Sequence, residues 1–243
     1  MKQVHCNLEN LKFAGQFRVL IGSLVIMFFF TACATGVSRV KLYEPLEYKP
    51  AKEETVKEAQ ASNSEIKSLN SQKIKIAINK IRDNRQDISC IGAKKNAYGM
   101  KMGKVDVEEG FIFIDLFKQH LIDSFQKAGY EIVPLRASSL TPSDNKDDVR
   151  AIVDAEVRSF WVEFMPGFFV VDAESDVNFE VRLKDIGNKE IWDETFIGKG
   201  KVSSGLGITR SMFEESINMA YSEAMKTFYK TISDDNVRKL LVK

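Results

Sequence analysis

The sequence predicts an α+β fold: an antiparallel or mixed sheet with two main helices packed on one face and a short C-terminal helix. Two observations lead to it. Apolar and charged residues alternate through 149–157 and 177–184, as in strands with one buried and one solvated face. Two other stretches, 114–128 and 213–228, repeat apolar residues every three or four positions, as helices lying on a sheet do.

The domain is expected to begin at Lys73, where isoleucines at 74, 76 and 78 alternate with Lys75, Ala77 and Asn79 in a strand pattern. Charged, turn-forming residues end this strand at 82–87, and a glycine-rich stretch follows that predicts loops and one short strand. A helix then presents one apolar face and ends at Gly129, a C-cap residue; its face consists of Ile114, Phe117, Leu121, Phe125 and Ala128. A short strand is expected at 130–133.

The second half predicts an antiparallel meander of three strands, with turns at Pro166-Gly167 and Gly187-Asn188 and the last strand over 191–199. Ser211 and Glu214 have the spacing of a capping box at the start of the final long helix. The apolar face of that helix consists of Phe213, Ile217, Ala220, Ala224 and Phe228. A short helix opened by Asp234 and Asp235 finishes the chain.

The N-terminal leader has a basic segment, an apolar run and then Phe30-Thr31-Ala32-Cys33. The stretch 19–32 is 14 residues long, short of the roughly 20 that span a bilayer, and it ends in small residues. These four residues resemble the lipobox of exported bacterial lipoproteins. The resemblance implies cleavage between Ala32 and Cys33 and lipidation of Cys33; an ordinary secretory signal or a buried helix is the alternative.

In this interpretation 1–32 is a cleaved signal peptide, 33–72 a lipidated N-terminus with a polar tether, and 73–243 a single α+β domain. A flexible tether of about 36 residues would have a root-mean-square span of roughly 35 Å, which would hold the domain clear of the membrane. The residue after Cys33 is Ala34 and not Asp. In Gram-negative lipoproteins that resemblance implies an outer-membrane location that faces the periplasm.

Charge and cysteine content argue against a nucleic-acid-binding protein and against an internal disulfide in the mature chain. Cleavage removes Lys2, Lys12 and Arg18, which takes Lys+Arg from 35 to 32, and Glu9, which takes Asp+Glu from 34 to 33. A net charge of −1 gives no footprint for nucleic acid. Once the first cysteine is cleaved off and the second is lipidated, Cys90 has no partner for an internal disulfide.

Several of these features together resemble the YajG-like bacterial lipoproteins. The features are the lipobox, the polar tether, the run Ile81-Arg82-Asp83-Asn84-Arg85 followed by Ile91-Gly92, the helix that ends in Ala128-Gly129-Tyr130, and the closing helix with Ser211, Phe213, Ile217 and Ala220. The resemblance covers about 73–241. It implies an exported lipoprotein of poorly defined activity, with no catalytic residues to transfer.

The mature chain offers little catalytic or metal chemistry. It has one histidine, His120, and one thiol, Cys90, with no CxxC and no HExxH, so no metal, cofactor or catalytic residue is predicted. The alternative hypothesis of a hydrolase depends on Cys90 and His120 meeting in space as nucleophile and base. The glycines at 198, 200, 205 and 207 lack the spacing of a phosphate-binding loop and are interpreted as strand bends and a loose connection.

The stretch 160–171 is apolar on both alternating faces across a turn. Either the tether or the loop 136–148 covers it, or it forms an exposed patch that binds a partner or lipid. The candidate contact residues are Phe160, Trp161, Phe164, Phe168 and Phe169.

The sequence therefore predicts a non-enzymatic, lipid-anchored cell-envelope protein that works in the periplasm as a binding, structural or assembly module. Its expected partners are the membrane, through the anchor, and an envelope protein or lipid; the sequence does not fix the oligomeric state. An auxiliary lipoprotein of a lipid or solute transporter is the alternative, and a Cys-dependent hydrolase is the rival from another class.

Overall fold

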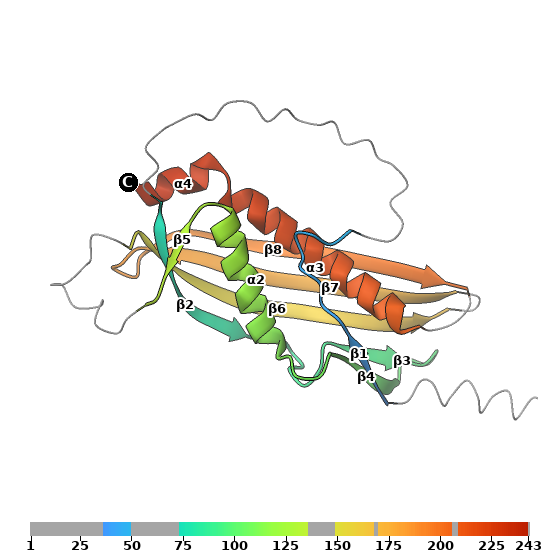
Figure 1. The fold of residues 1–243 in the computed structure, drawn as a ribbon. Helices are drawn as coiled ribbons and strands as arrows, with labels where there is room; N and C mark the ends of the chain where they lie inside the picture. The colour runs from blue at the N-terminus through green and yellow to red at the C-terminus, as the bar shows by residue number, and fades with distance from the viewer. Residues whose placement is uncertain (1–35, 50–72, 136–148, 168–169, 206–208, 243) are drawn as a thin grey trace, which may run out of the picture.

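The structure is a computed structural model that describes residues 36–49, 73–135, 149–167, 170–205 and 209–242. It confirms the α+β class, with a mixed eight-stranded sheet and helices on one of its faces (Figure 1). Among the described residues, no helix is both long enough and apolar enough to cross a bilayer. The leader, with Ala32 and Cys33, lies outside these ranges.

The long strand β6 (Ala151–Pro166) is the centre of the sheet. On one edge it pairs antiparallel with β7 (Val171–Lys184), which pairs in turn with β8 (Glu190–Ser204). This is the predicted meander. Asn188 takes a positive φ of 65° in the turn between β7 and β8, a conformation that asparagine tolerates better than most residues.

Two parallel strands share the other edge of β6. Its first half pairs with β2 (Lys75–Asp83), and its second half pairs with β3 (Gly92–Lys95). The short β5 (Glu131–Val133) lies beside β2, and β4 (Lys101–Val107) pairs antiparallel with β3. The glycine-rich stretch thus contains two strands, where the sequence predicted one.

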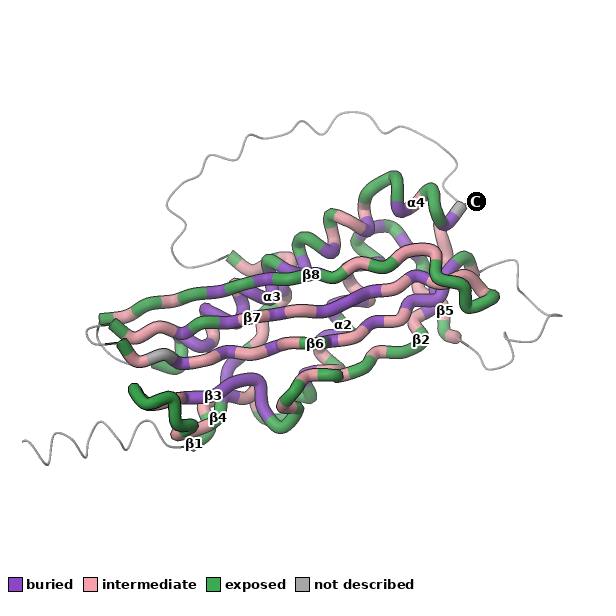
Figure 2. The backbone as a smooth tube through the Cα atoms, turned by 180° about the vertical axis from the view of Figure 1, so that it is seen from behind, coloured by how far each residue is buried: buried purple, intermediate pink, exposed green. Residues whose placement is uncertain are grey.

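The helices α2 (Phe113–Lys127) and α3 (Arg210–Ile232) pack on the same face of the sheet, and α4 (Asp235–Val242) follows. In Figure 2, no helix of the described ranges covers the opposite face. The predicted C-cap is confirmed, because Gly129 has a φ of 88° directly after α2. The core between the layers is rich in fully buried aromatic rings, among them Phe117, Phe125, Phe179, Phe196 and Phe228.

Gly198 and Gly200 lie inside β8, where α3 crosses it at very short range. A Cβ on Gly198 would lie 1.9 Å from the carbonyl oxygen of Ala220, and one on Gly200 would lie 2.0 Å from that of Ser216. The glycines therefore let a helix backbone approach a strand backbone. The interpretation of these two glycines as strand bends before a loose connection was wrong.

The predicted domain boundary at Lys73 was also wrong, because part of the expected tether belongs to the fold. Strand β1 (Gly36–Val40) pairs parallel with β4 over five residues, and the Val40 side chain is fully buried. Residues 41–49 then continue as a segment that lies along α3, which we call the N-terminal arm. The stretch contains apolar residues, and Leu42 packs against the core beside the buried Val40.

Candidate functional site

A row of polar side chains on α3 holds the N-terminal arm in place. Glu214, Asn218, Ser222 and Lys226 follow one another at four-residue spacing, which places them on one face of the helix. Each contacts the arm. The two central side chains are almost fully buried, at 2% and 3% exposure.

The hydrogen bonds of this row go mainly to the backbone of the arm. Asn218 accepts from the amide of Tyr43 at 2.8 Å and donates to the carbonyl of Lys41 at 2.8 Å. Ser222 donates to the carbonyl of Pro45 at 2.6 Å, and Lys226 donates to that of Tyr48 at 3.5 Å. These bonds satisfy backbone groups of the arm that docking removes from water.

The predicted capping box does not form. The helix begins at Arg210 after the N-cap Thr209, which makes no side-chain cap hydrogen bond. Glu214 instead accepts hydrogen bonds from the hydroxyl of Tyr43 and the amide of Lys41. A tertiary contact has replaced a local one.

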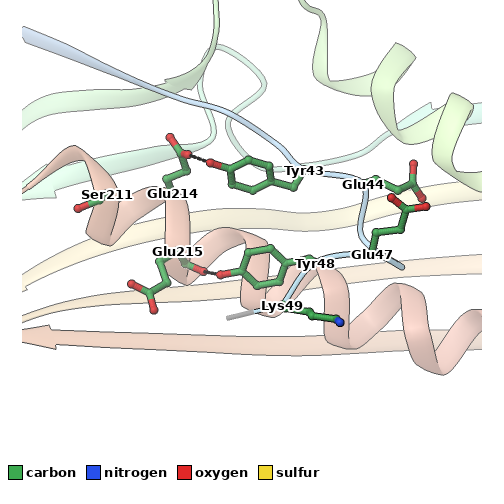
Figure 3. Close-up of a pocket in the computed structure, with 8 residues that line it drawn as sticks. All are labelled: Tyr43, Glu44, Glu47, Tyr48, Lys49, Ser211, Glu214 and Glu215. Carbon is green, nitrogen blue, oxygen red and sulfur yellow. Dashed lines mark hydrogen bonds between the residues drawn. The ribbon is translucent and has the colours of Figure 1, made fainter. Parts of the chain in front are cut away.

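A groove of about 510 Å³ opens between the arm and the first turns of α3 (Figure 3). Two tyrosine rings of the arm, Tyr43 and Tyr48, stack with their centroids 5.9 Å apart. The remaining lining residues are polar or charged and come from both walls: Glu44, Glu47 and Lys49 from the arm, and Ser211, Glu214 and Glu215 from α3.

Neighbouring groups shift the pKa values of the two groove tyrosines and surround the Glu44 carboxylate. The hydrogen bond to Glu214 raises the pKa of Tyr43, and burial beside Glu215 raises that of Tyr48 to about 12. Glu44 lies 3.5 Å from the ammonium of Lys127 and 3.8 Å from Nε2 of His120. Both phenols therefore stay protonated near neutral pH, and the groove offers hydrogen-bonding groups and aromatic ring faces.

The aromatic side chains of the stretch 160–171 point to opposite faces of the sheet where the structure describes them. Phe160 is 1% exposed and its ring centroid lies 4.1 Å from that of Phe113; Phe164 is 4% exposed and lies 6.3 Å from Phe213. Both face the core under α2 and α3, so their assignment as partner or lipid contacts was wrong. Phe168 and Phe169 lie outside the described residues.

Trp161 alternates to the open face, where it is half-buried. Its indole N–H donates to Glu163 at 3.3 Å, and the ammonium of Lys101 lies 5.7 Å from its ring centroid. It lines a hollow of about 430 Å³ at the notch between β2 and β3, together with Arg85 and Arg158. Phe160 also borders this hollow, but it is 1% exposed, so Trp161 is the more accessible of the two.

Cys90 and His120 have different partners. The buried thiol of Cys90 lies 3.5 Å from a carboxylate oxygen of Asp87 and 4.0 Å from the ammonium of Lys101. On α2, Nδ1 of His120 lies 2.9 Å from the hydroxyl of Tyr221. Burial lowers the pKa of His120, against the opposing field of Glu44. Within the described ranges, no cluster of three or more His, Cys, Asp or Glu side chains has the arrangement to hold a metal ion.

The sequence interpretation missed the groove because it assigned the whole arm to a tether. Two signals were present. Tyr43 and Tyr48 lie with Leu42 and Leu46 in one short segment, and α3 carries polar residues at four-residue spacing beside its apolar face. Neither signal reveals by itself that the two segments meet.

No protein-family model matches the sequence, and neither does any curated protein. Solved structures that resemble the fold include a homolog of neuraminyllactose-binding hemagglutinin from Helicobacter pylori, with a TM-score of 0.48, 11% identity, and coverage of 83% of this chain and 97% of that chain. Lipoprotein GNA1162 from Neisseria meningitidis gives a TM-score of 0.31 at 10% identity, covering 68% and 99% of the two chains. A minor lipoprotein from Acinetobacter baumannii gives 0.36 at 10% identity, covering 67% and 94%. Bacterial lipoproteins are thus among the structures that this chain resembles.

Proposed function

We propose that this protein is a lipid-anchored binding module of the bacterial cell envelope and that its partner occupies the groove between the N-terminal arm and α3. The observation that carries the proposal is the origin of the groove walls. One wall is the segment that begins a few residues after the lipobox cysteine, and the other is a helix integral to the core. The proposed anchor at Cys33 is therefore only a few residues along the chain from one wall of the groove.

The chemistry of the groove supports binding over catalysis. The two tyrosines present ring faces, and Glu47 and Glu215 supply acceptor oxygens. Such a surface suits a hydroxyl-rich or cationic group on an envelope protein or lipid. The proposal places the protein at the outer membrane, facing the periplasm, and among the YajG-like lipoproteins. It involves no catalytic step.

The two alternatives have less support. The transport-associated lipoprotein depended on aromatic side chains that reach an acyl chain, but Phe160 and Phe164 are in the core. The hydrolase needed Cys90 and His120 as a pair, but the contacts of the thiol are Asp87 and Lys101, and those of the imidazole are Tyr221 and Glu44.

Anchoring is tested with Cys33→Ser expressed in a Gram-negative host. The unaltered protein is expected in the membrane fraction, with a mature N-terminus that carries three acyl chains by mass spectrometry. The variant is expected to leave the membrane fraction, because acyl chains supply the membrane affinity. If both forms stay in membranes, or if no acyl chain is found on Cys33, the lipid anchor is refuted.

Partner binding is tested with a photo-crosslinking amino acid at position 47 in intact cells. Glu47 is at the rim of the groove with a side chain that is 76% exposed. The matched control is Glu190, an exposed residue at the start of β8. We expect a crosslinked species at position 47 that is absent at 190 and is lost in the Tyr48→Ala background; equal yields at both positions would exclude the groove.

A further inference from the structure

The lipid anchor lies very close to one end of the sheet. Three peptide links separate Cys33 from Gly36, and at 3.8 Å between successive Cα atoms they reach at most about 11 Å. Gly36 opens β1, which is fixed to β4 by parallel pairing from Gly36 to Val40. The chain between Cys33 and the fold is therefore short, and acyl chains on Cys33 would bring this end of the sheet to the membrane.

The strand registers show which loops share that end. Gly36 pairs with Gly103 near the start of β4, so the β3–β4 turn at 96–100 lies just beyond it. At the same end of β6, Pro166 pairs with Val171, which in turn pairs with Ser204. Figure 1 shows β1, β3 and β4 grouped beside this end of the long strands.

Large apolar side chains are exposed at this end. Tyr98 is 88% exposed, Met100 58%, Val37 54% and Val170 44%. They come from β1, the β3–β4 turn and the β6–β7 hairpin, which are remote in sequence and are assembled at one end by the sheet. Exposed apolar side chains grouped in this way indicate a contact surface.

The β3–β4 turn is well structured, so it presents Tyr98 in a defined position. The side-chain oxygen of Asn96 accepts from the amides of Tyr98 at 3.0 Å and Met100 at 2.9 Å. Gly99 supplies the positive φ of 78° that the turn requires. A tyrosine at the tip of such a turn suits the bilayer interface, where its ring lies among headgroups and its hydroxyl remains hydrated.

We propose that this end of the sheet rests on the bilayer, with Tyr98, Met100, Val37 and Val170 in the headgroup region. The proposal rests on the proposed lipid anchor at Cys33 and adds an orientation to it. Lys95, Lys101 and Lys201 at this end are each paired with a carboxylate. The contact is therefore apolar in character, and its strength depends little on salt or on anionic lipid.

The test uses the lipidated full-length chain reconstituted in phosphatidylcholine vesicles that contain lipid brominated on its acyl chains. A fluorophore is attached at Tyr98→Cys, and the matched control is Glu190→Cys, at the opposite end of β8. Over the 15 residues of that strand, at about 3.3 Å each, the two ends are roughly 46 Å apart. The unaltered protein is the labelling control, because its Cys90 thiol is 1% exposed.

We expect quenching at position 98 to exceed that at position 190 at least fivefold and to persist in high salt. A label at Met100→Cys gives a second measurement in case the Tyr98 variant unfolds. Equal quenching at 98 and 190 in anchored protein would overturn the orientation while the anchor stands. Self-quenching between copies at 98 without bromolipid quenching would overturn it in favour of self-association. If mass spectrometry finds no acyl chains on the protein, that result counts against the lipid anchor itself and is known before any quenching is measured.

Discussion

Replacing Gly200 by alanine tests the close approach of α3 to β8. The added Cβ would lie 2.0 Å from the carbonyl oxygen of Ser216 and 3.1 Å from the amide nitrogen of Ala220, both backbone atoms of α3. Contacts below 3.0 Å essentially do not occur for real Cβ atoms, so α3 or β8 has to move by about 1 Å. The movement would also disturb the hydrogen bonds of Ser216 to Gly200 and Ala173.

Overpacking of this kind costs about 2–3 kcal/mol. For a domain of this size each kcal/mol lowers the melting temperature by roughly 2–4 °C, so we expect a loss of about 4–12 °C. Differential scanning calorimetry measures it directly. Because Glu214 and Glu215 precede Ser216 on the same helix, the crosslinking yield at the groove should fall as well.

The control is Lys199→Ala in the same strand. Lys199 is exposed, and the hydrogen bond from its backbone amide to Glu223 at 2.7 Å survives the substitution. Its effect should stay within about 0.5 kcal/mol. If Gly200→Ala melts no lower than Lys199→Ala, the close approach of α3 to β8 is refuted, and with it the explanation of both glycines.

Three further predictions test other parts of the argument. Phe164→Ala should cost about 3–5 kcal/mol in chemical denaturation, because it empties a core site, whereas a partner-contact role would leave stability intact. Because His120 has a folded-state pKa below its ordinary 6.5, the unfolded chain binds the proton more tightly, and stability falls as pH drops through 6.5 towards the folded pKa. The melting temperature of His120→Gln should therefore depend less on pH between about 7.5 and 5.5 than that of the unaltered protein. The same pH dependence in both proteins would contradict this. Asn218→Ala should raise the hydrogen-exchange rate of the Tyr43 amide at least tenfold, since that amide loses its acceptor, while Thr227→Ala, whose hydroxyl bonds within its own helix, should not.

The sequence alone determined the regular elements. The apolar repeats at 114–128 and 213–228 became α2 and α3, and the alternating stretches became the meander of β6, β7 and β8. The end of α2 at Gly129 and the turn at Asn188 were also predicted from the sequence, because each depends on local backbone conformation. The fold class followed because these patterns show which face of each element must be buried.

Only the tertiary structure decided where the N-terminal arm lies and which aromatic side chains are covered. Tyr43 and Asn218 are 175 positions apart, and no local pattern links the arm to a polar row on a distant helix. Glu214 fitted a capping box by spacing, yet it binds Tyr43, because the docked arm brings a hydroxyl and a backbone amide to its carboxylate. Phe160 and Phe164 showed the same limit: alternation shows that they share a face, but only the position of α2 and α3 determines that this face is buried. Local periodicity fixes which residues point the same way, and the long-range packing of the chain decides what they meet there.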